Sequence, residues 1–276
     1  MAVRGLDRDM AFRQFLRGRV EWPRLEGVAR ELADRYDESV VRGEFLDADN
    51  WLSTPCVVDE QWFVKVISPQ HALLHGLLTA GRNIGAFSSG QEGFFERFED
   101  PVAMAEHELE ATRRMRDIGV NAPAPVEAFE HDGLGVLVLE YLPEFTPLSK
   151  VDEETALALA PALFAALRNL HDHDLAHGDL RGENVLVAQG DLYFIDATNV
   201  RADDDALERA RSYDLACALG VLAPLVGARE AVAAALDAYT VEELLAARDF
   251  LDFVNLRPDH DFEGVSVKSE IERAAN

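Results

Sequence analysis

The sequence predicts an α+β protein of two parts, a β-rich first half and a helical second half. Short apolar runs bounded by turn residues fill residues 39–142, whereas apolar residues recur at helical spacing after Pro143. Strands and helices do not alternate as βαβ units, which argues against a parallel α/β sheet. Hydrophobic residues make up 48% of the 276 residues, so each part can form a core.

The first half is expected to contain two hairpins and two helices. Asp59-Glu60-Gln61 and Asp132-Gly133 are turn-like sequences between apolar runs, which predicts the hairpins. Ser68-Pro69 and Asp100-Pro101 each place a capping side chain before a proline, which predicts helix starts. Glycines and serines between residues 81 and 93 predict a loop. The expected strands are Cys56–Val58, Trp62–Ile67, Val126–Phe129 and Gly135–Tyr141, and the expected helices are 69–78 and 101–118.

Helices dominate both ends of the chain. The stretch Asp152–His173 is apolar at helical spacing, and Pro161 is expected to kink it or divide it in two. The domains expected are a helical extension over residues 1–38, a first lobe over 39–142 with an insertion at 68–100, and a second lobe over 143–276. The remaining expected helices are Asp9–Arg17, Pro23–Tyr36, Asp204–Leu225, Arg229–Tyr239 and Val241–Phe253, and the strands are Val185–Ala188 and Leu192–Ile195.

The chain is strongly acidic, with 51 acidic against 26 basic residues and a net charge of −25. This charge argues against binding to nucleic acid or anionic membranes and is typical of proteins adapted to high salt. No apolar run reaches about 18 residues, and no signal peptide is recognisable, so we expect a cytoplasmic, halophilic protein. Cys56 and Cys217 form no motif, and no disulfide is expected. Only Met1–Arg24 is basic, at +3.

The strongest chemical signal is the segment His177–Asn184, which runs into the apolar Val185-Leu186-Val187. Phosphoryl transfer needs a carboxylate beside the attacking hydroxyl and an oxygen ligand for Mg²⁺ nearby. Asp179 and Asn184, five positions apart on a loop before a strand, can supply both. A capped turn with solvated charges is the plainer alternative. Phe194-Ile195-Asp196 ends the next strand, so a hairpin should return the Asp196 carboxylate to the side of Asn184.

A lysine inside an apolar strand is the second signal. Lys65 lies within Trp62–Ile67, where burial of its ammonium group costs free energy unless an anion is close. Only three lysines occur in the chain, and arginine fills the other basic positions, which makes this lysine informative. An edge-strand lysine that reaches solvent is the alternative.

Together these residues resemble the protein-kinase superfamily. The resemblance implies a two-lobed protein-kinase-like fold with a β-rich N-lobe and a reduced helical C-lobe. It implies that Asp179 orients or deprotonates the acceptor and that Arg181 contacts the transferred phosphate. Asn184 and Asp196 would bind Mg²⁺. The residues implied to hold ATP are Lys65, its helix partner Glu108 (alternatively Glu110), Ser53 near the phosphates, and the hinge residues Glu140 and Leu142. Asp214 would accept hydrogen bonds from the catalytic-loop backbone.

Several features resemble the RIO family of atypical protein kinases, of haloarchaeal type. Lys65 and Glu108 are separated by a long insertion, and seventeen residues between Asp196 and Asp214 leave no room for an ordinary activation segment. Unlike most kinases, the chain has no glycine-rich motif before Lys65. The resemblance implies an ATP- and Mg²⁺-dependent serine/threonine kinase or ATPase whose partners are a protein substrate or itself, with a pre-ribosomal particle docked by Met1–Arg24. It also implies autophosphorylation at Ser88 or Ser89. A small-molecule kinase of the aminoglycoside or lipopolysaccharide kinase type and a pseudokinase scaffold remain alternatives.

Overall fold

The computed structural model describes residues 20–37, 42–45, 53–73, 75, 79, 100–197, 204–256 and 260–276. The helix expected over Asp9–Arg17, the loop serines Ser88 and Ser89 and most of the basic segment lie outside these residues. The described chain forms two compact units. The first contains the described residues before residue 80 together with 100–110 and 124–142, and the second contains 111–123 and the described residues from 143 onward.

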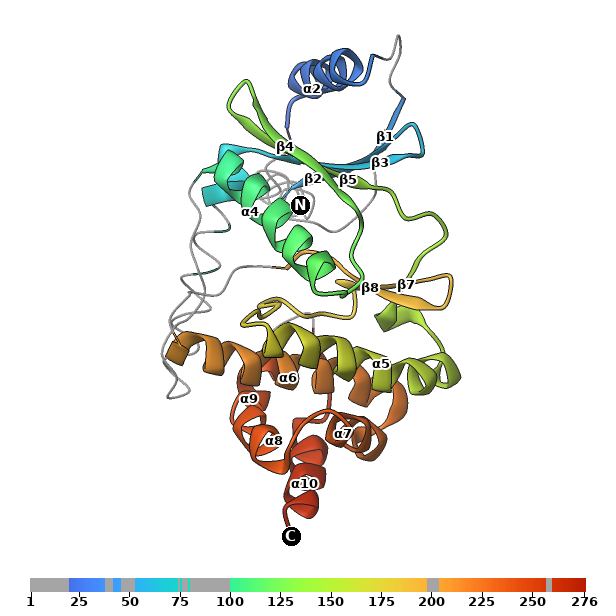
Figure 1. Ribbon diagram of the computed structural model, residues 1–276, viewed down its shortest axis with the longest axis vertical. Helices are drawn as coiled ribbons and strands as arrows, with labels where there is room; N and C mark the ends of the chain where they lie inside the picture. The colour runs from blue at the N-terminus through green and yellow to red at the C-terminus, as the bar shows by residue number, and fades with distance from the viewer. Residues whose placement is uncertain are drawn as a thin grey trace, which may run out of the picture. The chain divides into compact units, whose positions relative to one another are not determined.

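The first unit is built on a five-stranded antiparallel sheet in the order β1-β2-β3-β5-β4 (Figure 1). The expected hairpins are both present: Cys56 pairs with Val64 in the first, and Phe129 pairs with Val136 in the second. The described strands are β1 (Gly43–Phe45), β2 (Thr54–Val58), β3 (Trp62–Ile67), β4 (Pro125–His131) and β5 (Leu134–Glu140).

A helix packs on each face of this sheet, because successive strand residues point to opposite sides. Val64 and Val66 of β3 form a cluster with Val28 and Leu32 of α2 (Trp22–Arg35). Ile67 and the partly buried Phe63, on the other side, contact the cluster formed with Ala105 and Leu109 of α4 (Pro101–Asp117). Lys65 shares the alternation of Phe63 and Ile67 and therefore faces α4.

Local sequence signals fix both ends of α4. The Asp100 carboxylate accepts hydrogen bonds from the amides of Val102 (2.7 Å) and Ala103 (3.0 Å), as an N-cap does. The helix ends before Gly119, whose φ of +83° lies in the left-handed region that glycine adopts readily. The helix expected over residues 101–118 is therefore confirmed.

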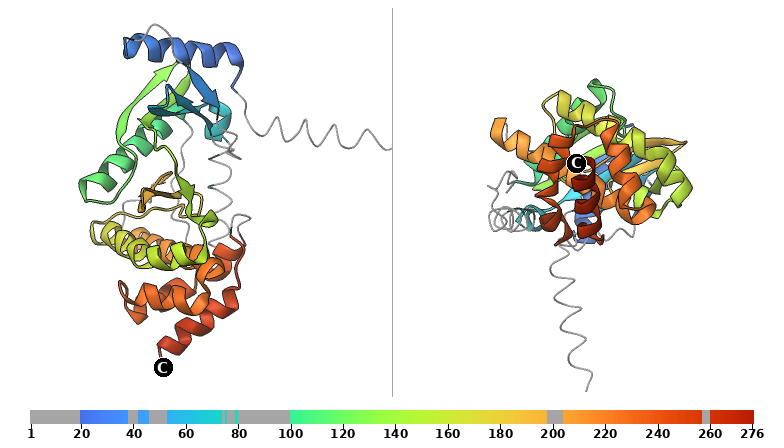
Figure 2. Two further views of the ribbon diagram at one scale, coloured as in Figure 1. Left: turned by 90° about the vertical axis from the view of Figure 1, so that its right-hand side faces the viewer. Right: turned by 90° about the horizontal axis from the view of Figure 1, so that it is seen from below.

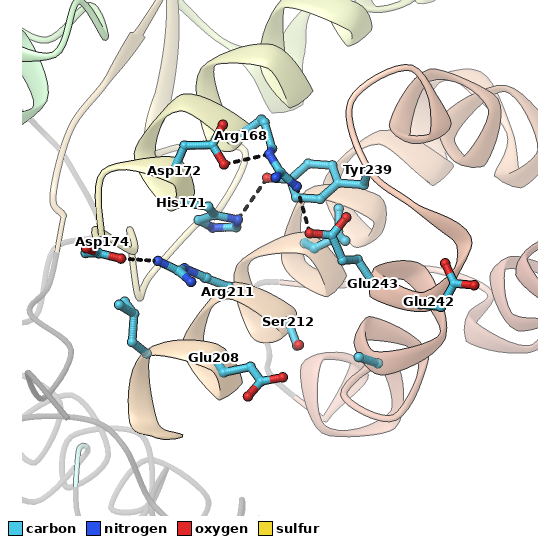
Figure 3. A pocket seen from close by; sticks show the side chains of 13 residues that line it. Arg168, His171, Asp172, Asp174, Glu208, Arg211, Ser212, Tyr239, Glu242 and Glu243 are labelled. Carbon is cyan, nitrogen blue, oxygen red and sulfur yellow. Dashed lines mark hydrogen bonds and ion pairs between the residues drawn. The ribbon is translucent and has the colours of Figure 1, made fainter. Parts of the chain in front are cut away.

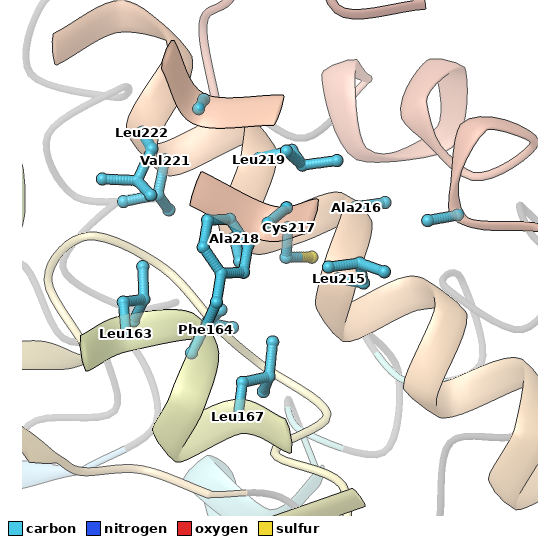
Figure 4. Close-up of a cluster of buried hydrophobic side chains, with 14 of the residues drawn as sticks. Leu163, Phe164, Leu167, Leu215, Ala216, Cys217, Ala218, Leu219, Val221 and Leu222 are labelled. Atoms are coloured by element: carbon cyan, nitrogen blue, oxygen red, sulfur yellow. The ribbon is translucent and has the colours of Figure 1, made fainter. Parts of the chain in front are cut away.

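The second unit combines a three-stranded sheet, in the order β6-β7-β8, with a bundle of helices (Figures 1 and 2). Leu163, Phe164 and Leu167 of α5 pack against α6 residues around Leu215 and Leu219 (Figure 4). Its elements are β6 (Thr146–Pro147), the 3₁₀ helix η1 (Leu148–Lys150), α5 (Glu153–Asp172), β7 (Val185–Ala188), β8 (Asp191–Phe194), α6 (Asp204–Val226), α7 (Ala228–Leu236), α8 (Val241–Arg248), α9 (Leu251–Asn255) and α10 (Gly264–Ala274).

Two expectations for this unit need correction. Pro161 was expected to kink the helix or divide it, and it does not divide α5, which is one helix of 20 residues. Pro161 and Leu157, whose carbonyl would accept the missing amide, are both exposed, so solvent can satisfy that carbonyl. The helix expected over Val241–Phe253 is two helices, α8 and α9, and the junction residue Phe250 packs its ring against Tyr213 at 6.2 Å. Helix α10 was not foreseen.

The architecture is thus α+β, with a sheet unit and a mainly helical unit. None of the described helices combines the length and apolar character needed to cross a bilayer.

Candidate active site

The sheet unit pairs Lys65 with Glu108. The Lys65 ammonium lies 2.7 Å from Oε1 and 2.9 Å from Oε2 of the carboxylate. Both side chains are largely buried, with 7% and 15% of their surface exposed. The partner is therefore Glu108 and not Glu110, because Glu108 lies on the side of α4 that faces β3. Such a pair holds a cation at a fixed position on the sheet.

The other residues expected to contact the nucleotide occupy two ends of strands. Ser53 is buried directly before β2. Glu140 is the exposed last residue of β5; its amide donates to the Ala124 carbonyl (2.8 Å), and its carboxylate accepts from the Ala124 amide (3.3 Å). Leu142 follows two residues later and is half-buried. Their contacts with ATP stay a prediction.

In the helical unit, Asp179 and Asn184 belong to one tight loop. The Asn184 amide nitrogen donates to the Asp179 backbone carbonyl at 2.9 Å and lies 3.5 Å from the Asp179 carboxylate. The backbone amide of Asn184 donates to the Arg181 carbonyl at 3.0 Å, which closes the turn. Asn184 is 2% exposed, so these bonds orient its side chain firmly.

Arg181 contacts both ends of this loop. Its Nη2 donates to the Asn184 amide oxygen (3.2 Å), and its Nε lies 3.4 Å from Oδ2 of Asp179. The side chain is still 31% exposed. The guanidinium group therefore sits where the expected base and the expected metal ligand converge, and it can meet an anion there.

The next position in the loop, Gly182, is a glycine because a side chain there would collide with a neighbouring segment. A Cβ at this position would lie 2.7 Å from the Ser149 side chain, and the Ser149 amide donates to the Gly182 carbonyl at 3.2 Å. The loop therefore packs its backbone directly on η1, and a larger residue would push the two apart.

The hairpin β7–β8 brings the backbone around Asp196 close in space to the backbone of Asn184. Val185 pairs with Phe194, and the Ile195 amide extends the ladder by donating to the Asn184 carbonyl at 3.0 Å. Asp196 follows with a φ of +58°, a left-handed conformation that is uncommon outside glycine. Strained backbone of this kind often occurs at functional sites.

Asp214 anchors the start of the loop from helix α6. Its carboxylate accepts the amides of His177 (2.6 Å) and Gly178 (2.8 Å) and is fully buried. Gly178 has a φ of +76°, which explains a glycine after His177. The expected hydrogen bonding of the loop backbone to Asp214 is confirmed.

His177 ties the loop to the end of β8. Its Nε2 lies 3.0 Å from the Ile195 carbonyl and donates to it, while Nδ1 accepts the Asp179 amide at 3.4 Å. Burial lowers the pKa of His177, although the carboxylates of Asp214, Asp179 and Asp196 oppose that shift. The neutral His177 ring therefore connects the loop to the end of β8 by hydrogen bonds, and it does not supply a proton to a reaction.

The oxygen donors of this loop fit Mg²⁺. The Asn184 amide oxygen and the Asp196 carboxylate are hard ligands, and Mg²⁺ commonly takes one or two such protein ligands besides phosphate oxygens. No group of three His, Cys, Asp or Glu side chains that could hold a metal occurs among the described residues. A metal ion here would therefore depend on the nucleotide for further ligands.

Sequence reasoning missed two buried residues behind the loop. His171 Nε2 lies 3.5 Å from Asp214 Oδ2, and the Tyr239 hydroxyl lies 2.9 Å from His171 Nδ1. His171, six residues before His177 at the end of an apolar helix, could have been noticed as a buried polar residue. Tyr239 is 68 residues further along and gave no sequence signal.

Two sequence comparisons agree with this geometry. Residues 98–212 match the family described as the RIO domain. A stretch of 103 residues is 32% identical to the KEOPS complex subunit Bud32 of Pyrococcus abyssi (strain GE5 / Orsay), covering 35% of this chain and 44% of that protein. The chain thus matches less than half the length of this relative.

Solved structures give weaker likenesses. The aminoglycoside-3'-phosphotransferase of type VIII is 18% identical, with 84% of this chain and 99% of that chain covered and a TM-score of 0.49. The PAN3 pseudokinase of Drosophila melanogaster is 16% identical, with 83% and 63% covered and a TM-score of 0.41. The likeness rests on the two sequence matches: part of the chain is similar to Bud32, and residues 98–212, which include α4, the loop and the β7–β8 hairpin, are similar to the RIO domain.

Proposed function

We propose that this chain is an ATP-dependent phosphotransferase that moves the γ-phosphate of Mg·ATP to a serine or threonine hydroxyl of a protein or of the chain itself. The observation that carries the proposal is the loop in which Asp179, Arg181 and Asn184 contact one another. Asp214 holds that loop by two backbone amides. A carboxylate, a cation and an amide oxygen in one braced turn are the groups that phosphoryl transfer requires.

In the proposed reaction the acceptor oxygen bonds to the γ-phosphorus while the bond to the β-phosphate oxygen breaks, and ADP leaves. The Asp179 carboxylate orients the acceptor hydroxyl and takes its proton. Arg181 neutralises charge on the transferred phosphoryl group, and to do so its guanidinium shifts from Asn184 toward phosphate.

The sheet unit supplies the nucleotide contacts in this proposal. Lys65, held by Glu108, binds phosphate oxygens, and Glu140 and Leu142 contact adenine through their backbones. Mg²⁺ held by Asn184 and Asp196 would supply positive charge to the phosphates.

The test is Asp179→Asn. Transfer of labelled phosphate from ATP to the chain itself and to candidate proteins should fall about 10²–10⁴-fold, the usual share of a general base. Nucleotide binding, measured as thermal stabilisation by Mg·ATP, should persist, because Asp179 acts on the acceptor. Asp191→Asn, at the exposed start of β8, is the matched control and should retain transfer. Transfer by Asp179→Asn at the wild-type rate would refute the proposal.

A small-molecule acceptor is the second candidate. Only seventeen residues separate Asp196 from Asp214, too few for the segment on which ordinary kinases dock peptides. Labelling of a metabolite mixture in the same assay, without labelling of protein, would favour this candidate. Absence of nucleotide binding and of any transfer would favour a pseudokinase scaffold.

Protein partners belong to the proposal as well. The Bud32 relative is named as a subunit of the KEOPS complex, which favours a protein assembly as the setting. Docking of the basic segment Met1–Arg24 on a pre-ribosomal particle, in a salt-rich cytoplasm, is a further part of the proposal. It predicts that deletion of this segment reduces co-sedimentation with ribosomal particles.

A further inference from the structure

Behind the catalytic loop, three buried side chains form a chain of hydrogen bonds. The Tyr239 hydroxyl is 2.9 Å from His171 Nδ1, and His171 Nε2 is 3.5 Å from Asp214 Oδ2. None of the three residues is more than 5% exposed. Figure 3 shows the His171 and Tyr239 side chains facing each other at the wall of a pocket of about 500 Å³.

The donors and acceptors in this chain follow from the two ends. Asp214 is a carboxylate that already accepts the His177 and Gly178 amides, so His171 must present an N–H to it from Nε2. In the neutral ring Nδ1 then carries a lone pair, which accepts the Tyr239 hydroxyl proton. Burial and the carboxylate of Asp214 raise the pKa of Tyr239, so this hydroxyl keeps its proton.

Tyr239 is held in place from several sides. Its ring packs edge-on against Phe164 at 6.5 Å, and the Arg168 guanidinium lies over it at 5.5 Å. Arg168 is itself bound by Asp172 (2.8 Å) and Glu243 (2.7 Å). The hydroxyl is therefore fixed relative to α5 by packing and by charge, and it can act as a rigid donor.

We propose that Tyr239 is a positioning residue for the catalytic loop: its hydroxyl holds the His171 ring in place through Nδ1, and His171 in turn steadies the Asp214 carboxylate that holds the loop. Tyr239 lies outside residues 98–212, the part that matches the RIO domain, so the helices after α6 contribute to the loop. The inference rests on the proposed function only in treating this loop as catalytic.

The mechanism predicts a specific defect in Tyr239→Phe. Without the hydroxyl, the buried Nδ1 lone pair of His171 has no donor. The Asp214 carboxylate still keeps the proton on Nε2, but the imidazole is no longer held from its other side, so its hydrogen bond to Asp214 weakens. A buried hydrogen bond contributes about 0.5–1.5 kcal/mol, which corresponds to a factor of about 2–12 in an equilibrium.

The experiment uses the whole chain and two nuclear magnetic resonance readouts. In wild type, nitrogen-15 spectra should show His171 protonated at Nε2 and not at Nδ1. In Tyr239→Phe the Nδ1 resonance should shift toward that of a nitrogen that accepts no hydrogen bond, and hydrogen exchange of the His177 and Gly178 amides should accelerate about 2–12-fold relative to other amides of the helical unit. Tyr36→Phe is the matched control. The Tyr36 hydroxyl also donates a partly buried hydrogen bond, to Glu127 at 2.8 Å, but this bond lies in the sheet unit.

Each outcome is decisive. Equal acceleration of all amides in the helical unit would mean that Tyr239 only stabilises the fold, and this result would overturn the inference. A wild-type His171 protonated at Nδ1 would also overturn it, even if Tyr239→Phe did not fold. If wild type transfers phosphate, Tyr239→Phe should lower kcat and leave the KM for ATP unchanged. If wild type transfers none, the proposed function fails while both spectroscopic readouts still test Tyr239.

Discussion

The Lys65–Glu108 pair offers a quantitative test of the sheet unit. The perturbation is a double-mutant cycle: Lys65→Met, Glu108→Leu and both together. Each single change leaves one nearly buried charge without its partner, since the two side chains are only 7% and 15% exposed. The double change replaces the pair by apolar side chains of similar length.

The expected magnitudes follow from burial. Removal of one partner of a buried pair costs about 3–5 kcal/mol, whereas replacement of both partners by apolar residues is often close to neutral. We expect each single variant to lose about 3 kcal/mol of unfolding free energy and the double variant to lie within about 1 kcal/mol of wild type. The coupling energy, which is the sum of the two single losses minus the loss in the double variant, is then about 5–7 kcal/mol.

Urea denaturation followed by tryptophan fluorescence measures these changes, because the described tryptophans, Trp22 and Trp62, both lie in the sheet unit. The exposed pair of Arg30 with Glu26, at 3.2 Å on α2 of the same unit, is the matched control. Its coupling should be about 0–1 kcal/mol and should vanish in 1 M salt, where the Debye length is about 3 Å. The Lys65–Glu108 coupling should persist there.

Additive effects of Lys65→Met and Glu108→Leu would refute this reasoning, and so would a coupling that salt removes. Either result would mean that solvent reaches the pair. The double variant, although folded, should also show no stabilisation by Mg·ATP, because the Lys65 ammonium expected to bind the phosphates has been removed.

Two further predictions concern single residues. Asp196→Asn should weaken the thermal stabilisation by Mg·ATP while leaving stabilisation by ATP without Mg²⁺ unchanged, because the carboxylate is the expected charged metal ligand; an unchanged response to Mg²⁺ would place the metal elsewhere. Burial raises the pKa of Cys56 to about 11 from its ordinary value of 9.0. The unfolded thiol therefore ionises first, and the fall in unfolding free energy between pH 9 and 11 should be about 2 kcal/mol larger in wild type than in Cys56→Ala.

Local chemistry in the sequence was sufficient to predict most elements. The turns at Asp59–Gln61 and Asp132-Gly133, the cap at Asp100 and the stop at Gly119 each act over a few residues, so their effects can be read without knowledge of the fold. The same holds for the order Asp179, Asn184, Asp196, because a short hairpin joins the three.

The helices after α6 were predicted less well. The break between α8 and α9 has no glycine or proline to mark it, and it follows from the packing of Phe250 on Tyr213. Pro161 lies inside α5 without dividing it, because its side of the helix faces solvent. In both cases burial decided the outcome, and burial depends on the whole unit.

The sequence by itself determined the loop, the two hairpins and the identity of the lysine on β3, because each depends on neighbours in the chain or on strand alternation. Only the tertiary structure decided that Glu108 and not Glu110 meets Lys65, since that choice depends on which side of α4 faces the sheet. The tertiary structure also decided that Tyr239 reaches the loop through His171 and Asp214. Residues 68 and 43 positions apart cannot signal a hydrogen bond in sequence, because folding alone brings their atoms within reach.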